Sequence, residues 1–555
     1  MSASIGRNSL IMASGTAASR VTGLLRTILL AAALGTTGLA ANAYQTGAMI
    51  PQVIFTVVSG GVFNAVLVPQ IVRTLKEQDA EQRLNRLITV AIVLMTGVTV
   101  LMMLATPLLT ALYVDSSWNA AQRALVNSFT LWCMPQIFFY GLYTVLGQIL
   151  AAKNHFSTYA WSSVGANVIS CIGFMTFIAM FGKANQQPIE FWTTDKVALT
   201  AGCWTLGVAF QAVVLFIPLI RLGIRYRPSW GLRGIGLRSM GPVAVWSLGI
   251  MGIQEVTNVV NTRITTGAPE RAALLHDLSI YDVAGNATYQ NAYSLYILPY
   301  SLIAVSVATA IFPKISAAVA QNDINTARND LSFALRNTGL LMMFFTVALV
   351  VMPLPIILVL LPSAGAAEAA LIASPLVSLS IGLVPVSVYL MVQRTFYAFE
   401  DGKHPFIFQL AACSTQMVIE LVLVAILPPT YWVAVIGWAI SLSYICCFPA
   451  LLIMLRKRFH GNVDGKRIAV TYGKAIVAAL ISGTLGILVM RVWPLAASIQ
   501  YETGASSWFQ SLTVCIVVTI VITIAYIGTL FILRTQELLD LVQTFRAKFV
   551  RKRNS

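Results

Sequence analysis

Charge is scarce in this chain of 555 residues. Only 10% of its residues are charged, 20 of them are acidic, and none of the acidic residues precedes Glu77; an ordinary soluble domain has roughly 25% charged residues. No G-x-x-x-x-G-K-[ST] phosphate loop occurs, and no cluster of histidines and carboxylates of a catalytic kind. The seven cysteines lie in apolar stretches without metal-ligand spacing. These absences argue against a soluble domain, an ATPase, a membrane-embedded enzyme, a metal centre and a disulfide scaffold.

Apolar sequence is what the chain has in abundance. It is 57% hydrophobic, with a mean hydropathy of +0.79. A helix needs ~20 apolar residues to cross a bilayer, so we expect an all-α polytopic membrane protein with about fourteen transmembrane helices. The expected spans are 10–34, 43–68, 87–113, 127–151, 158–181, 197–220, 240–262, 288–312, 333–361, 371–393, 406–427, 431–455, 470–490 and 511–533.

The basic residues are distributed unevenly over the loops between these spans. With the amino terminus inside, 27 lysines and arginines fall on the inner side and six outside, with Arg20, Arg26 and Lys474 in spans. The positive-inside rule then places both termini in the cytoplasm. The net charge of +16 is explained by topology in the cell membrane, and we expect no nucleic-acid partner.

Two arginines, Arg20 and Arg26, interrupt the first apolar span in the segment SRVTGLLRTILLAAALG. Each costs on the order of 2.5–3.5 kcal/mol in insertion, so we expect both to face a wet cavity or an anion. Guanidinium groups suit phosphate and diphosphate oxygens, which they bind with forked hydrogen bonds. A structural ion pair is the alternative, and the lack of acidic residues in the early spans weakens it.

Two segments recur about 250 residues apart and predict an internal repeat. GGVFNAVLVPQIVR resembles SVATAIFPKISAAV, with Pro69 matching Pro313, and LAAKNHFSTYAW resembles FYAFEDGKHPFIFQL, with Phe156 matching Phe406. A chance likeness of two apolar stretches is the alternative. We expect two parallel six-helix halves around a central cavity, residues 1–225 and 226–460, followed by a helix pair with a basic amphipathic cytoplasmic tail, residues 461–555. That tail is expected to lie on anionic membrane lipids, a solvated tail being the alternative.

Polar residues in two later spans are candidates for a coupling-ion site. Glu255 lies in the seventh span, and Gln416 and Glu420 lie one turn apart in the eleventh. Buried carboxylates in membranes mark ion or proton sites, so these three residues are predicted to bind Na⁺ or exchange H⁺. Hydrogen bonding between helices is the competing interpretation. We expect no other cofactor.

The quoted segments, with NAYQTGAMIPQVIFTVVSGGVFNAVLVPQIVR, resemble the MurJ (MviN) family of bacterial lipid II flippases in the multidrug/oligosaccharidyl-lipid/polysaccharide exporter superfamily. The resemblance covers nearly the whole chain, fourteen spans included. It implies transport of an undecaprenyl-diphosphate-linked disaccharide-pentapeptide for peptidoglycan synthesis. It also implies that Arg20 and Arg26 engage the diphosphate, that spans thirteen and fourteen form a groove for the lipid tail, and that the family's cation site falls near Glu255, Gln416 and Glu420.

The chain departs from this family pattern at four positions. Thr27 and Asn42 stand where many members have aspartate, and Phe55 and Ser294 stand where arginines are expected. The substrate is then held with fewer charges, or Arg263 or Lys474 substitutes, or the cargo differs. The expected substrate contacts are Arg20, Arg26, Asn42, Gln52, Arg263 and Ser294.

The sequence therefore predicts a transporter, not an enzyme, that flips lipid II between the leaflets by alternating access. The alternatives are a flippase for another undecaprenyl-diphosphate-linked glycan and a cation-coupled multidrug exporter. A drug site would be apolar and aromatic with an essential carboxylate. Membrane lipids and cell-wall synthesis proteins are the candidate partners.

Overall fold

A computed structural model describes residues 2–60, 80–153, 155–224, 226–230, 242–498 and 505–539. These residues form helices and their connections, with no strand among them. They divide into two compact units, Met1–Ala287 and Thr288–Ser555. The sequence-based division at residues 225 and 460 stays a prediction.

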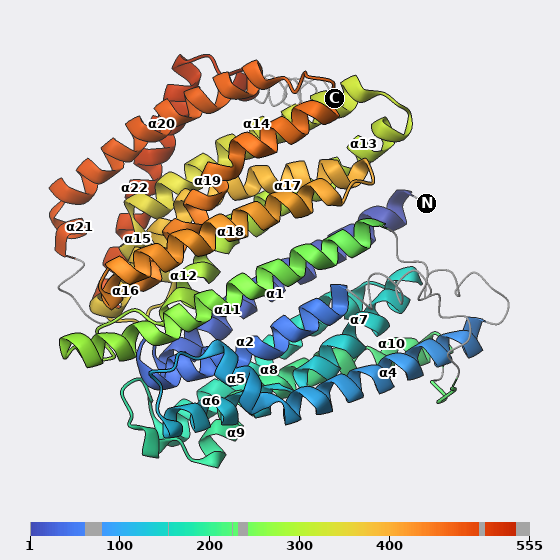
Figure 1. Ribbon diagram of the computed structural model, residues 1–555, viewed down its shortest axis with the longest axis vertical. Coiled ribbons are helices and arrows are strands. Elements are labelled where there is room, and N and C mark those ends of the chain that lie inside the picture. The colour runs from blue at the N-terminus through green and yellow to red at the C-terminus, as the bar shows by residue number, and fades with distance from the viewer. Residues whose placement is uncertain are drawn as a thin grey trace. The chain divides into compact units, whose positions relative to one another are not determined.

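In the first unit the long helices run side by side (Figure 1). α1 packs along α8, α8 along α9, and α2 against α6 and α7. The helices of this unit are α1 (Ser2–Leu34), α2 (Gly38–Val58), α4 (Ala80–Leu104), α5 (Thr106–Tyr113), α6 (Ala120–Cys133), α7 (Gln136–Ala152), α8 (Ser157–Phe181), η2 (Ile189–Phe191), α9 (Thr194–Val213), α10 (Phe216–Arg221) and α11 (Pro242–His276).

The second unit begins within α12 and contains the last two long helices, α20 and α22. These two pack against each other, and α20 also packs along α14. The helices from α12 onward are α12 (Asn286–Pro299), η3 (Tyr300–Ala304), α13 (Val305–Ala320), α14 (Ile324–Val351), α15 (Pro353–Leu360), α16 (Ala366–Ile381), α17 (Leu383–Ala398), α18 (Lys403–Ile426), η4 (Pro429–Tyr431), α19 (Trp432–Arg458), α20 (Gly465–Val492), α21 (Pro494–Ser498) and α22 (Ala505–Ile532).

The number of spans agrees with the expectation of a many-span membrane protein. Among the described residues, twelve helical segments are long and apolar enough to cross a bilayer, or thirteen if α16 and α17, bent by 45°, form one span. The expected second span starts as α2, and its continuation past residue 60 lies outside the described residues. The same holds for the first copy of the GGVFNAVLVPQIVR repeat and for most of the basic tail.

Prolines break several of the predicted spans into two helices. The third span is interrupted at Ala105, two residues before Pro107, and the ninth at Met352, directly before Pro353. After Pro299, the eighth span passes through a π-helical turn at Tyr300–Ala304. A proline lacks the amide donor of the helix and clashes with the preceding turn, which accounts for the breaks at these points.

One helix differs clearly from its expected length. The seventh span was expected to end at residue 262, but α11 continues to His276. The segment after Arg263 contains Ala and Leu, which favour helix, and its polar residues contact α5 and α6. Arg263 and Arg271, which were expected in an outer loop, therefore lie on the last turns of α11.

Large apolar side chains cover the outside of the described helices. Leu104, Val492 and Ile532 are among the most exposed, at 78%, 77% and 79%. Such a surface would aggregate in water, whereas lipid tails solvate it. The interior of the first unit includes a group of aromatic side chains, among them Tyr44, Phe129 and Phe174, all fully buried.

A close approach of α8 and α9 fixes how these two helices pack. At Gly207 an added Cβ would lie 2.5 Å from the carbonyl oxygen of Ala166. Only glycine permits this distance, because the obstacle is backbone. The contact sets the position of α9 beside α8, and through α8 beside α1.

Candidate functional site

Arg26 lies on α1 with its guanidinium against an aromatic ring from α9. Its Cζ atom lies over the indole of Trp204, 4.4 Å from the ring centroid. Both side chains are half-buried. A cation over the face of a tryptophan is attracted by the ring quadrupole, and tryptophan is the strongest such partner. The contact joins the first span to the sixth predicted span.

Trp204 is itself held by the buried aromatic cluster. Its ring stacks on Tyr44, with centroids 6.1 Å apart and planes inclined by 24°. Tyr44 packs edge-on against Phe129 and Phe174, and its buried hydroxyl has no hydrogen-bond partner among the described residues. Tyr44, Trp204 and Arg26 thus stack in this order, with Tyr44 in the core of the unit and the Arg26 guanidinium on the Trp204 ring.

Arg26 has no acidic partner in the described part of the chain. No hydrogen bond or ion pair to its guanidinium occurs there, and Glu77 is the first acidic residue of the whole sequence. The Trp204 contact uses the positive charge but not the N–H donors. A guanidinium carries five such donors in a fixed plane, so Arg26 retains the capacity to bind an anion.

Arg20 stands nearer the start of the same helix and is exposed. Beside it, α1 is held to α8 by Asn167, whose Nδ2 donates to the Ser19 carbonyl at 3.1 Å and to the Thr22 hydroxyl at 3.2 Å. The two arginines predicted to act together thus differ in environment, since Arg26 has an aromatic neighbour and Arg20 has no described side-chain contact.

Asn42, predicted as a substrate contact, lies in a packed helix junction. It is 2% exposed, and its Oδ1 accepts a hydrogen bond from the backbone N–H of Ala287 at 2.8 Å. Beside it, Asn286 donates to the Thr46 hydroxyl at 2.8 Å. These bonds hold α2 to the chain segment that enters α12, so the described contacts of Asn42 are structural ones.

The remaining predicted substrate residues are spread over both units. Gln52 on α2 and Ser294 on α12 are exposed. Phe55, at the position of an expected arginine, packs against Tyr140 with ring centroids 5.4 Å apart. An aromatic contact therefore occupies the place where the family pattern has a second-span cation.

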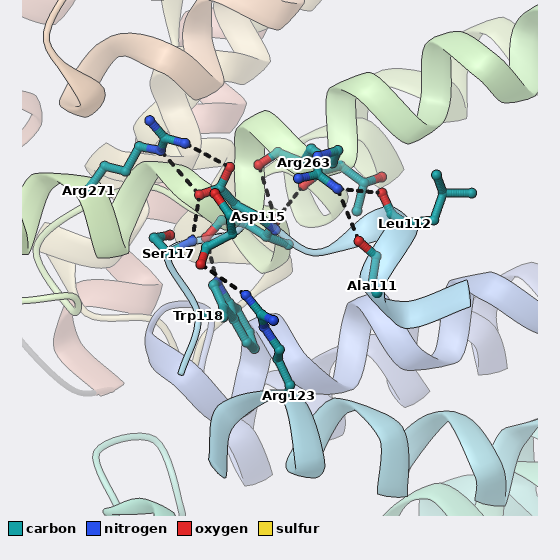
Figure 2. A network of polar contacts seen from close by, with 11 residues as sticks. Ala111, Leu112, Asp115, Ser117, Trp118, Arg123, Arg263 and Arg271 are labelled. Carbon is teal, nitrogen blue, oxygen red and sulfur yellow. Dashed lines mark hydrogen bonds and ion pairs between the residues drawn. The ribbon is translucent and has the colours of Figure 1, made fainter. Parts of the chain in front are cut away.

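Arg263 and Arg271 fasten the end of α11 to the connection between α5 and α6 (Figure 2). Arg263 donates to the carbonyls of Ala111 and Leu112 at 3.0 and 3.2 Å, at the last turn of α5. Arg271 forms two hydrogen bonds of 3.1 Å to the carboxylate of Asp115. The indole of Trp118 donates to the Thr266 carbonyl at 2.9 Å. Arg263 thus has a structural role that its sequence position did not indicate.

Sequence reasoning does not select Asp115, because its partner Arg271 lies in the part of α11 that extends past the expected end of the span. Burial by itself raises the pKa of Asp115, but the hydrogen bonds from Arg271 and Ser117, together with the charge of Arg271, outweigh burial and hold the pKa below its usual range. The charged carboxylate is therefore the form that the folded protein stabilises.

We predict an acid-sensitive contribution of this pair to stability. The folded pKa of Asp115 lies below its unfolded value of about 3.9; the contribution is therefore complete above that pH and is lost as the pH falls through the folded pKa. Because Arg271 is 42% exposed, Asp115→Asn is expected to cost only about 1 kcal/mol. Thermal unfolding of the purified protein between pH 6 and pH 3 tests this. The difference between the variant and the parent is expected to shrink as the pH falls towards 3, whereas the exposed Asp282→Asn is expected to match the parent throughout.

Two of the three predicted cation ligands are hydrogen-bonded to each other. On α18, Gln416 Nε2 donates to Glu420 Oε1 at 2.7 Å, and Glu420 is completely buried. Glu255 belongs to the first unit, where it is half-buried and accepts a hydrogen bond of 3.3 Å from Asn258. Among the described residues no group of three His, Cys, Asp or Glu side chains could hold a metal ion.

A comparison with protein families identifies the chain. The model of the lipid II flippase MurJ family matches residues 30–503. The chain belongs to this family. The MurJ family consists of transporters, so the prediction of a transporter in place of an enzyme is confirmed, as is the all-α multi-pass fold.

Curated relatives and solved structures agree with this family. The probable lipid II flippase MurJ of Rhizobium tropici is 23% identical over 87% of each chain, and that of Synechocystis sp. is 24% identical over 71% of this chain and 72% of its own. A solved lipid II flippase MurJ in an inward closed conformation superposes with a TM-score of 0.69 at 18% identity, covering 94% of this chain and 100% of its own. An inward-facing multidrug transporter of the MATE family gives 0.61 at 16% identity, covering 80% and 94%. The structural likenesses show the fold shared across these transporters.

Proposed function

We propose that this chain moves lipid II, the undecaprenyl-diphosphate-linked peptidoglycan precursor, from the inner to the outer leaflet of the cytoplasmic membrane. The observation that carries the proposal is Arg26, a cation within a span of a MurJ-family protein, set on Trp204 and without an acidic partner among the described residues. A diphosphate supplies the oxygen acceptors that such a guanidinium binds best.

The same observation separates this function from drug export. A site for cationic drugs requires a negative or aromatic surface, and a positively charged Arg26 repels such a ligand. The similarity to MATE transporters is a similarity of fold and carries no substrate with it. Anionic cargo is therefore favoured over cationic cargo.

The transport mechanism that fits this fold is alternating access. The polar head of the substrate would cross beside Arg26 while the polyprenyl tail stays in lipid, since burying a diphosphate in hydrocarbon is prohibitive. Both termini would lie in the cytoplasm, as the positive-inside rule requires, and enzymes of cell-wall synthesis would supply and consume the substrate.

The experiment that tests the function is depletion of the protein in its native bacterium, with labelling of lipid II that is specific for the outer leaflet. The expected result is accumulation of lipid II in the inner leaflet and loss of the outer-leaflet signal. A normal rate of appearance in the outer leaflet, with no redundant carrier present, contradicts the proposal. A defect restricted to another undecaprenyl-diphosphate-linked glycan would assign that cargo instead.

For the driving force we propose that Glu420 takes part in ion coupling. A completely buried carboxylate in a span is costly unless it binds a cation or a proton, and Gln416 adds an amide oxygen within the same turn. Na⁺ accepts such oxygen ligands, and H⁺ neutralises the carboxylate directly.

We predict that Glu420→Gln abolishes the stimulation of lipid II transfer by an imposed ion gradient, because the amide carries no charge to neutralise. Proteoliposomes with a Na⁺ gradient or a pH gradient measure this and also distinguish the two ions. The exposed Glu190→Gln serves as the control. Full stimulation of Glu420→Gln by both gradients would exclude the carboxylate from coupling.

A further inference from the structure

The contact between Arg26 and Trp204 suggests a role for an aromatic residue that no motif of the sequence singles out. A long arginine side chain in a span extends towards the nearest polar surface when nothing holds it. Here the guanidinium carbon stays 4.4 Å from the centre of the Trp204 ring. The ring therefore restrains the position of the Arg26 guanidinium along the axis of α1.

Trp204 is well suited to act as a fixed support. Its ring stacks on the fully buried Tyr44. The next residue, Thr205, donates to the Trp132 carbonyl at 2.7 Å and accepts from Gln136 Nε2 at 2.9 Å. These contacts fix α9 to α6 and α7 at the residue directly after the tryptophan.

Arg20 provides an internal comparison. It lies on the same helix and is exposed, with no described aromatic or polar side-chain partner. The entropy of a free arginine side chain, about 2 kcal/mol, is lost when such a residue binds a ligand. Arg26 has already lost part of that freedom, and its N–H donors remain available.

We propose that Trp204 is a positioning residue for diphosphate binding: its indole holds Arg26 so that the guanidinium donors meet the diphosphate of the lipid-linked substrate. This inference rests on the proposed function, because it takes Arg26 as the group that meets the diphosphate. The ring itself contacts the cation and not the anion. The benefit is preorganisation, which raises affinity without adding a contact to the ligand.

The first experiment measures binding of undecaprenyl diphosphate to the full-length protein in lipid nanodiscs. Trp204→Leu is expected to weaken binding about tenfold, the size of a partly desolvated cation–π contact. Trp204→Phe, which keeps an aromatic face, is expected to lose less than about threefold. Trp161→Leu is the matched control, because Trp161 is a 46% exposed tryptophan on the neighbouring α8, and it is expected to bind like the parent.

The second experiment asks whether Trp204 acts through Arg26. In an Arg26→Gln background, Trp204→Leu is expected to cause no further loss of binding, because the cation that the ring holds is gone. Such non-additivity distinguishes a positioning role from a general effect on folding. If Trp204→Leu does not accumulate in the membrane, the same cycle with Trp204→Met replaces it.

Two results would overturn the inference. One is parental affinity in Trp204→Leu, and the other is an equal loss in the parental and Arg26→Gln backgrounds. The outcome is separable from that of the proposed function. A protein that binds undecaprenyl diphosphate in a Trp204-dependent way but moves no lipid II refutes the function and retains the inference.

Discussion

Replacing Arg26 with glutamine is expected to lower the rate of lipid II transfer by about tenfold to a hundredfold, the equivalent of losing one charged hydrogen-bonding group at about 1.5–3 kcal/mol. Glutamine keeps a polar, though shorter, side chain and removes the charge that meets the diphosphate. The measurement is transfer of labelled lipid II across proteoliposomes that contain the purified variant.

Two variants make this result interpretable. Arg26→Lys keeps the charge but loses the planar fork, so an intermediate rate is expected. Arg221→Gln removes an exposed arginine at the end of α10 and is expected to leave the rate unchanged. Transfer by Arg26→Gln at the parental rate would remove the central observation behind the proposed function.

Replacing Arg336 with methionine is expected to destabilise the protein by about 3–5 kcal/mol, because it leaves Glu537 buried without its partner. The two side chains form an ion pair between α14 and the segment that follows α22, and they are 8% and 4% exposed. Arg336 Nε also donates to Ser332 at 3.2 Å, and Thr471 on α20 donates to Glu537 at 3.3 Å. The pair therefore joins three parts of the second unit.

The matched test is the double variant Arg336→Met with Glu537→Leu. Removing both charges removes the uncompensated carboxylate, so most of the lost stability is expected to return. Unfolding by denaturant in a fixed detergent measures both variants. A pair with one exposed partner provides the contrast: Arg271 is 42% exposed, and Arg271→Gln in the first unit is expected to cost about 1 kcal/mol or less. If the single and double variants are equally stable, the loss of stability in Arg336→Met does not come from leaving the Glu537 carboxylate unpaired.

The class of fold could be predicted from the sequence for simple reasons. Repeated stretches of ~20 apolar residues are long enough to cross a bilayer and indicate membrane-spanning helices. Pro353 accounts for the break before α15 because it lacks an amide donor. Arg26 could also be found in advance, because a charge in an apolar span is costly by itself. The family segments at the start of the chain then indicated the substrate.

The partners of the predicted residues could not be found in the same way. Arg263 was one of the predicted substrate contacts and, with Lys474, a candidate to replace a missing cation; its described bonds are to carbonyls of α5. Asn42 was expected to contact substrate, yet its described bond is to the backbone of Ala287. In both cases the sequence gives the chemistry of the side chain but not the group that lies opposite to it.

The sequence by itself determined that this protein is a helical membrane protein with Arg26 in its first span, because hydropathy and charge act locally along the chain; that it is a transporter followed from its likeness to a known family. Only the tertiary structure decided that Trp204 lies against that arginine, that Asp115 meets Arg271, and that Arg336 meets Glu537. These pairs join segments far apart in the chain, and their formation depends on how helices pack, which no local pattern of residues encodes.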